Sequence, residues 1–317
     1  MKRSYRKQRK NRTRHVGRMR LLLLLAGLAV AVFGLAKLAG YGWDLLAARQ
    51  ASKDLQDVYR SVPTDGPIQE TPEPTAALTL GPTPIETAAL TPSPSPVPTL
   101  TAVAYPNNPK LQISSRFKAL RRENKDVIGW LRLSDLLDEP VVQRNDVFYL
   151  SHDAKGKKNV NGAIFLEAAI ELKIRPYTYI LYGHNMKSSA MFGCLRNYES
   201  KAYYHAEPFV SFDTIYEEGR YVIFAVGSVS IEEYGRHFVD FHDLKSMDWE
   251  ARQNAIDALI SASVFTCSID VRADDQILLL VTCTEKDQDR RVVAARRIRD
   301  GEDENELKQL VDNSWKK

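Results

Sequence analysis

The stretch ILLLVTCTEKDQDRRVVAARRI, residues 277–298, constrains the fold of this chain more than any other. Residues 277–282 and 292–298 are apolar and rich in β-branched side chains, and a polar turn separates them, which predicts a β-hairpin. If the hairpin is symmetric about Asp287, Cys283 lies directly opposite Arg291, with their Cβ atoms about 5 Å apart. A neighbouring cation favours the nucleophilic thiolate, and a guanidinium can bind an oxygen that gains negative charge. The alternative interpretation of these residues is a buried structural Cys and an exposed strand Arg.

The N-terminal region predicts a membrane anchor. Residues 1–20 carry ten Lys or Arg and no acidic residue, and a long apolar run follows over residues 21–46. This run is close to the roughly 20 residues that a bilayer core requires, although a cleaved signal peptide is an alternative. Positive charge before the anchor predicts a single-pass protein of the cell membrane, with residues 1–20 in the cytoplasm and the remainder on the extracellular face. The other 297 residues hold 34 basic and 40 acidic side chains, which argues against nucleic acid as a partner.

Residues 47–107 have the composition of a linker. Twelve of the 15 prolines lie between Pro63 and Pro109, among Thr, Ser and Ala. Such a segment buries too little apolar surface to fold, so we expect an extended, disordered extracytoplasmic spacer. A Pro-rich peptide ligand is the alternative function for it. The folded domain is then expected over residues 108–317.

The pattern within residues 108–317 predicts a mainly β domain. Residues 111–123 and 249–265 have the spacing of helices, and the expected strands before the hairpin cover residues 127–133, 140–143, 147–150, 163–166, 177–182 and 221–229. Many short strands with a few helices suggest a closed or nearly closed β-barrel with helical insertions.

A nucleophilic thiol needs a base or a cationic partner, so the six histidines are candidates. His184 ends the apolar run TYILYG and opens a polar loop, where a rigid scaffold presents functional side chains, and His152 also follows a strand-like run. The other histidines, His15, His205, His237 and His242, lie in the cytoplasmic tail or in polar stretches. A structural role is open for each of them. The spacings HxxxH and CxxC are absent, so a zinc site has little support.

The two remaining cysteines give a separate prediction. Cys194 and Cys267 are too few for a disulfide framework, and we expect both to be small structural residues. A disulfide between the two is the alternative.

Several motifs occur in an order that resembles a known family. NKDVIGWLRL with EPVVQ, VFYLSHDAKGKKNVNGAIFLE and YILYGHNMKSSAMFGCLRNY are followed by ILLLVTC and RRVVAARRI. Together they resemble class B sortases of Gram-positive bacteria, over residues 108–298. The family's TLxTC signature is matched in part, since Thr282 and Cys283 are retained while Leu279 and Val281 depart from it. The insert at 240–263, which precedes the predicted strand that ends at Cys283, is the feature that points to class B.

The resemblance implies an eight-stranded β-barrel cysteine transpeptidase that uses no metal or cofactor. Cys283 is then the nucleophile that forms a thioester with a C-terminal sorting signal of a surface protein, His184 protonates the leaving amine, and Arg291 stabilises the oxyanion. Thr282 is a candidate substrate-binding residue. An amine of a peptidoglycan cross-bridge or of a pilin subunit would resolve the thioester. A membrane-tethered cysteine hydrolase and a non-catalytic wall-binding module are the alternative functions.

Overall fold

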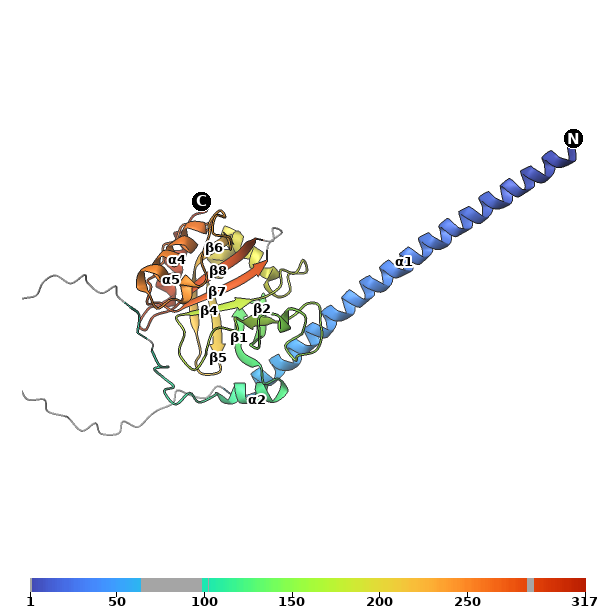
Figure 1. The fold of residues 1–317 in the computed structure, drawn as a ribbon. Coiled ribbons are helices and arrows are strands. Elements are labelled where there is room, and N and C mark those ends of the chain that lie inside the picture. Colours follow the sequence, from blue (N-terminus) through green and yellow to red (C-terminus); the bar gives the residue numbers. More distant parts are fainter. Residues whose placement is uncertain (1, 64–98, 102, 284–287) are drawn as a thin grey trace, which may run out of the picture. The chain divides into compact units, whose positions relative to one another are not determined.

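The computed structural model describes residues 2–63, 99–101, 103–283 and 288–317, and the chain divides into two compact units, 1–50 and 51–317 (Figure 1). The first unit belongs to helix α1, Lys2–Ser61. Over Leu23–Ser61 this helix is long and apolar enough to cross a membrane. An N-terminal apolar helix was expected from the sequence of residues 21–46.

The second unit contains eight strands and several helices. The strands are β1 Val127–Leu133, β2 Leu137–Val142, β3 Ile164–Leu166, β4 Thr178–Tyr182, β5 Phe209–Thr214, β6 Arg220–Ser230, β7 Ile277–Cys283 and β8 Asp289–Arg297. The α-helices are α2 Ser115–Glu123, α3 Lys201–Ala206, α4 Trp249–Ala262 and α5 Glu304–Asp312, and the 3-10 helices are η1 Phe148–Leu150, η2 Phe192–Glu199 and η3 Asp243–Lys245.

The eight strands close into a barrel in the order β1-β2-β3-β4-β7-β8-β6-β5. Two neighbouring pairs, β2 with β3 and β4 with β7, are parallel, and the remaining pairs are antiparallel. The closed, mainly β barrel with helical insertions that the sequence predicted is therefore confirmed. The parallel pairing of β4 with β7 brings together the ends of two strands that are about a hundred residues apart in the chain.

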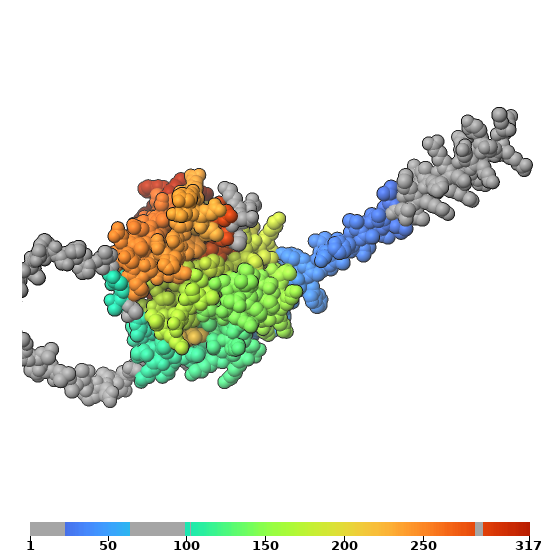
Figure 2. Space-filling model, in the orientation of Figure 1, coloured from blue at the N-terminus to red at the C-terminus, as the bar shows by residue number. Residues whose placement is uncertain are grey.

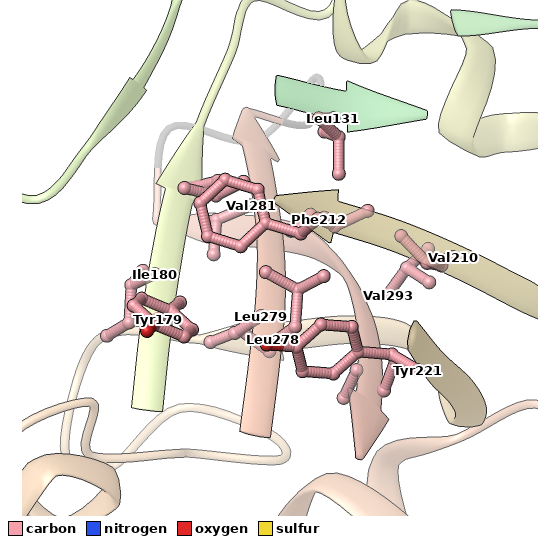
Figure 3. Packing of buried hydrophobic residues seen from close by; sticks show 14 of the residues in the cluster. Leu131, Tyr179, Ile180, Val210, Phe212, Tyr221, Leu278, Leu279, Val281 and Val293 are labelled. Atoms are coloured by element: carbon pink, nitrogen blue, oxygen red, sulfur yellow. The ribbon is translucent and has the colours of Figure 1, made fainter. Parts of the chain in front are cut away.

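Apolar side chains fill the barrel and also cover its outer surface. Tyr179 of β4 packs edge-on against Phe212 of β5, with ring centroids 5.2 Å apart, and Leu278 of β7 is paired with Tyr179 (Figure 3). Val293 of β8 is buried in the same cluster. Both faces of β7 are buried, so this strand is a continuous apolar run instead of an alternating one. A strand buried on both faces provides a rigid support for the residues at its end.

Helix α4 covers one outer face of the barrel, where it packs against β6. Gly227 of β6 permits this contact, because a Cβ atom there would lie 2.4 Å from the carbonyl oxygen of Ala262. Figure 2 shows the segments from α2 to α4, green to orange, as one closely packed body on the face in view. The insert at 240–263 thus belongs to the body of the domain.

Two differences from the sequence predictions concern strands. Residues 147–150 were predicted as a strand, but they include the 3-10 helix η1, because Asn145 Oδ1 accepts hydrogen bonds from the backbone N–H groups of Val147 and Phe148 and turns the chain. Strand β5 was not predicted. It is only six residues long, and polar side chains interrupt its apolar pattern.

The expected spacer over 47–107 differs from the structure at both ends. Residues 51–61 of α1 belong to the barrel unit, with Leu55 completely buried and Tyr59 stacked on Trp130 at a centroid distance of 4.3 Å. Near the other end, Tyr105 is buried and its hydroxyl donates to the carbonyl of Leu172. The barrel unit therefore begins at Ala51, earlier than the predicted residue 108. Residues 64–98 and 102 of the predicted spacer lie outside the described residues.

Candidate active site

The candidate site lies at the carboxyl ends of the parallel strands β4 and β7. Tyr182 is paired with Val281, and the backbone N–H of Gly183 donates to the carbonyl of Val281 at 3.2 Å. His184 follows Tyr182 by two residues, and Cys283 follows Val281 by two residues. Parallel pairing in this register carries both positions to the same end of the barrel. The side chain of Cys283 and residues 284–287 lie outside the described part of the chain.

A backbone carbonyl holds the ring of His184. Its Nε2 atom lies 2.7 Å from the carbonyl oxygen of Leu150, the last residue of η1, which precedes the loop before β3. A carbonyl oxygen only accepts hydrogen bonds, so Nε2 carries a proton in this arrangement. Gly162 brings the loop close, because its φ of +62° suits glycine and a Cβ atom there would lie 3.0 Å from His184 Cδ2. The loop thus fixes the orientation of the imidazole and leaves Nδ1 for other partners.

The β7–β8 hairpin forms, but its register differs from the prediction by one residue. Cys283 is paired with Arg290, and Thr282 is paired with Arg291. The expected direct opposition of Cys283 and Arg291 is therefore wrong. The register follows from the partners inside the sheet and not from symmetry about Asp287. It pairs Leu280 of β7 with Val293 of β8, both fully buried, whereas a one-residue slip would bring Arg296 opposite the buried Leu278.

Arg291 lies between β7 and β6 and is paired with an acidic side chain. On β8 its neighbours across the sheet are Thr282 and Ser228. Its Nε donates to Glu199 Oε1 at 2.8 Å, and its side chain is 19% exposed. The Thr282 hydroxyl is buried, and the described residues offer it no hydrogen-bond partner. An unsatisfied buried hydroxyl at a position paired with Arg291 marks a place where a polar ligand group can bind.

Arg290 extends from the other side of β8. Arg290 lies two residues before Val292, which pairs with Val281 and, through it, stands in line with Tyr182, so the alternation along β8 turns Arg290 to the Tyr182 side of the sheet. Its Nη1 donates to the carbonyl of Asp289 at 3.0 Å. Two arginines of opposite orientation therefore flank the end of β7.

The other histidines and cysteines lie elsewhere or have structural contacts. His152 stacks on Phe148, with ring centroids 3.9 Å apart, and His205 contacts Ser314. Cys194 and Cys267 are both free thiols, so the alternative of a disulfide between them is wrong. Burial raises the pKa of the Cys194 thiol to about 12, and burial also raises that of Cys267, which makes both poor nucleophiles.

Comparison with known proteins identifies the family. The chain is 31% identical over 193 residues to sortase B of Listeria monocytogenes, covering 76% of that protein, and 30% identical over 176 residues to sortase B of Staphylococcus aureus, covering 69%. The chain belongs to the sortase B family. Members of the sortase B family are cysteine transpeptidases, and this is the activity of the chain. No protein-family model matches it.

Solved sortase B structures share the fold. A Bacillus anthracis protein similar to sortase B superimposes with a TM-score of 0.58 at 22% identity, covering 79% of this chain and 95% of that one. The Staphylococcus aureus sortase B–substrate complex superimposes with a TM-score of 0.52 at 27% identity, covering 61% of this chain and 88% of that one. The resemblance to class B sortases that the sequence motifs predicted is thereby confirmed.

Three features of this sortase B site had no signal in the sequence. The carbonyl of Leu150 is a backbone group, and its contact with His184 spans 34 residues of chain. The pairing of Glu199 with Arg291 spans 92 residues. The position of Arg290 opposite Cys283 depends on a register that only the packed sheet defines.

Proposed function

We propose that Cys283 is the nucleophile, His184 the proton donor and acceptor, and Arg291 the oxyanion-binding residue of this sortase B. The observation that carries the proposal is the register of β4 with β7, in which His184 and Cys283 follow paired residues at the same strand ends. Side chains two residues apart on a strand share a face, so we expect the imidazole and the thiol to lie on the same face of the sheet.

In the first half-reaction, the Cys283 thiolate attacks the carbonyl carbon of a peptide bond in the sorting signal. The carbonyl oxygen becomes an oxyanion, which a preorganised guanidinium stabilises. The C–N bond then breaks, and the leaving amine takes a proton from the imidazolium form of His184. A thioester on Cys283 and a neutral imidazole result.

In the second half-reaction, an amine attacks the thioester carbonyl and gives a proton to His184. The C–S bond breaks, the thiolate of Cys283 returns, and a new amide is formed. Since Nε2 of His184 already donates to the Leu150 carbonyl, Nδ1 is the atom that exchanges the proton with the substrates. The proton count balances over the two half-reactions, because the imidazole that is formed in the first accepts the proton of the second.

The assignment of the oxyanion donor has a second candidate. Arg291 matches the arginine-bearing strand of the family, and it is paired across the sheet with Thr282, whose buried hydroxyl is unsatisfied and which we propose contacts the substrate. Arg290 is favoured by the register that pairs it with Cys283. Substitution of each arginine by Lys distinguishes the two, because Lys keeps the charge and loses the planar pair of donors.

The partners and the location of the reaction belong to the same proposal. The similar Staphylococcus aureus protein has been solved as a substrate complex, and another sortase B, 29% identical with a TM-score of 0.51, has been solved with triglycine. We propose that this chain takes the sorting signals of surface proteins and an amine of a peptidoglycan cross-bridge or a pilin subunit. The apolar helix over Leu23–Ser61 supports a membrane anchor with the catalytic domain on the extracellular face.

Product analysis tests the function. The barrel unit would be incubated with a peptide that carries the sorting signal of a surface protein encoded beside this gene, with triglycine as the acceptor amine. We expect a peptide–triglycine amide from the wild type and no product from Cys283→Ala. Release of the free acid alone, at every triglycine concentration, would favour the hydrolase. Unchanged product from Cys283→Ala would refute the assignment of the nucleophile.

A further inference from the structure

Arg291 is held by one carboxylate at the end of η2. Its Nε donates to Glu199 Oε1 at 2.8 Å, and the exposed fractions of the two side chains are 19% and 39%. Both backbone edges of Arg291 are fixed as well, since β8 pairs with β7 on one side and with β6 on the other. The contact therefore joins a rigid strand to the segment that follows the His184 loop.

The η2 segment is itself well supported. Leu195 and Tyr198 are fully buried, and Lys316 Nζ donates to the backbone carbonyl of Glu199 at 3.2 Å. A fixed backbone limits the positions that the carboxylate can take. Glu199 therefore presents its oxygen to Arg291 from a preorganised position.

The same short helix also holds the loop that begins at His184. Arg196 donates from Nε to the carbonyl of Gly193 at 2.7 Å and from Nη2 to the carbonyl of Met186 at 2.6 Å. Any side chain at position 193 would clash, because a Cβ atom there would lie 2.1 Å from the carbonyl oxygen of Met186. The segment between His184 and Glu199 thus links the two parts of the site.

We propose that Glu199 is a positioning residue, which orients the guanidinium of Arg291 for the oxyanion and the peptide. The inference rests on the role proposed above for Arg291. A hydrogen bond from Nε fixes the plane of a guanidinium, and the Nη groups keep their N–H donors for substrate oxygens. Without this contact, Arg291 would have to be ordered in each catalytic cycle, at a cost in rotamer entropy.

Variants of Glu199 test the proposal by steady-state kinetics with the sorting-signal peptide and triglycine. For Glu199→Ala we expect a loss of about tenfold in kcat, the size of one charge-assisted hydrogen bond, with KM changed less than about threefold. Glu199→Gln keeps an acceptor oxygen for Nε and should recover most of the rate. The matched control is Glu304→Ala, which removes a comparable pair with Arg220 at 3.0 Å and should leave kcat unchanged.

A double-mutant cycle separates positioning from a structural role. In an Arg291→Lys background there is no guanidinium to orient, so Glu199→Ala should add less than about a twofold loss. If Arg291→Lys is severely impaired while Glu199→Ala keeps kcat within about twofold of the wild type, the positioning role is refuted and the role of Arg291 stands. Fully additive losses would also refute positioning. An active Arg291→Lys would instead overturn the proposed role of Arg291, and the role of Glu199 with it.

Discussion

The end of α1 should act as a structural part of the catalytic domain, and its removal should destabilise the barrel. The perturbation is a fragment of residues 63–317, compared with one of residues 47–317. Within residues 51–61, Leu55 is completely buried. Tyr59 stacks on Trp130, and its hydroxyl donates to the Asp213 carboxylate at 2.7 Å. Loss of this segment exposes one face of Trp130 and leaves the buried Asp213 without that donor.

The size of the effect follows from these contacts. Burial of Leu55 and Tyr59 is worth about 2 to 3 kcal/mol each, and the hydrogen bond to the Asp213 carboxylate adds about 1.5 kcal/mol. The entropy cost of ordering the segment offsets part of what its contacts contribute, and we expect a net contribution of ~3 kcal/mol. For a domain of this size, that corresponds to a melting temperature about 6 to 12 °C lower.

Thermal melts by circular dichroism provide the assay. The double variant Leu55→Ala/Tyr59→Ala in the longer fragment should reproduce most of the loss, and Lys53→Ala, at an exposed position of the same helix, is the matched control. A synthetic peptide of residues 47–62 should raise the melting temperature of the shorter fragment. Equal melting temperatures for the two fragments would refute the reasoning and restore a domain that begins after the Pro-rich segment.

Three further predictions concern side chains of the barrel. Arg291→Lys should lower kcat about a hundredfold, as expected for the loss of one oxyanion donor, with little change in melting temperature. Arg290→Lys should leave kcat nearly unchanged. The reverse pattern would assign oxyanion binding to Arg290. Cys194→Ala should lower stability by about 1 to 2 kcal/mol with unchanged kcat, because this buried thiol donates to the Met191 carbonyl at 3.1 Å; loss of peptide cleavage at full folding would contradict a structural role. Burial raises the pKa of Glu139 to about 7, so between pH ~4.5 and 7 the folded chain binds more protons than the unfolded chain and stability falls as pH rises. Glu139→Gln should remove that fall, worth about 3 kcal/mol, in urea unfolding across this range. An unchanged slope would show that the Glu139 carboxyl does not carry the effect.

Local patterns in the sequence were sufficient for most of the barrel. The apolar runs over 127–133 and 277–282 correspond to β1 and to most of β7, because buried strands are recognisable from their own residues. The end of α4 was predicted three residues too far along the chain, an ordinary uncertainty for helix ends. Cys283 and His184 each end an apolar run, the resemblance to class B sortases singled out His184 among the histidines, and the structure places both after paired residues of β4 and β7.

What the sequence could not provide depends on contacts between distant residues. The hairpin register follows from packing of Leu280 with Val293 inside the sheet, whereas the turn residues alone suggested a symmetric arrangement about Asp287. The docking of Leu55 and Tyr59 also depends on residues that are distant in the sequence. Their spacing of four fits one helix face, but the surface that they cover, including Trp130, is formed by strands about seventy residues away.

The most direct test of the account is the identity of the covalent intermediate. The barrel unit would be mixed with the sorting-signal peptide in the absence of an acceptor amine, quenched in acid and measured by intact-protein and peptide mass spectrometry. We predict one acyl group on Cys283, released as the amide when triglycine is added before the quench, and none on Cys194 or Cys267. An acyl group on another residue, or cleavage with no protein adduct at any time, would contradict the thioester mechanism and the site built around β4 and β7.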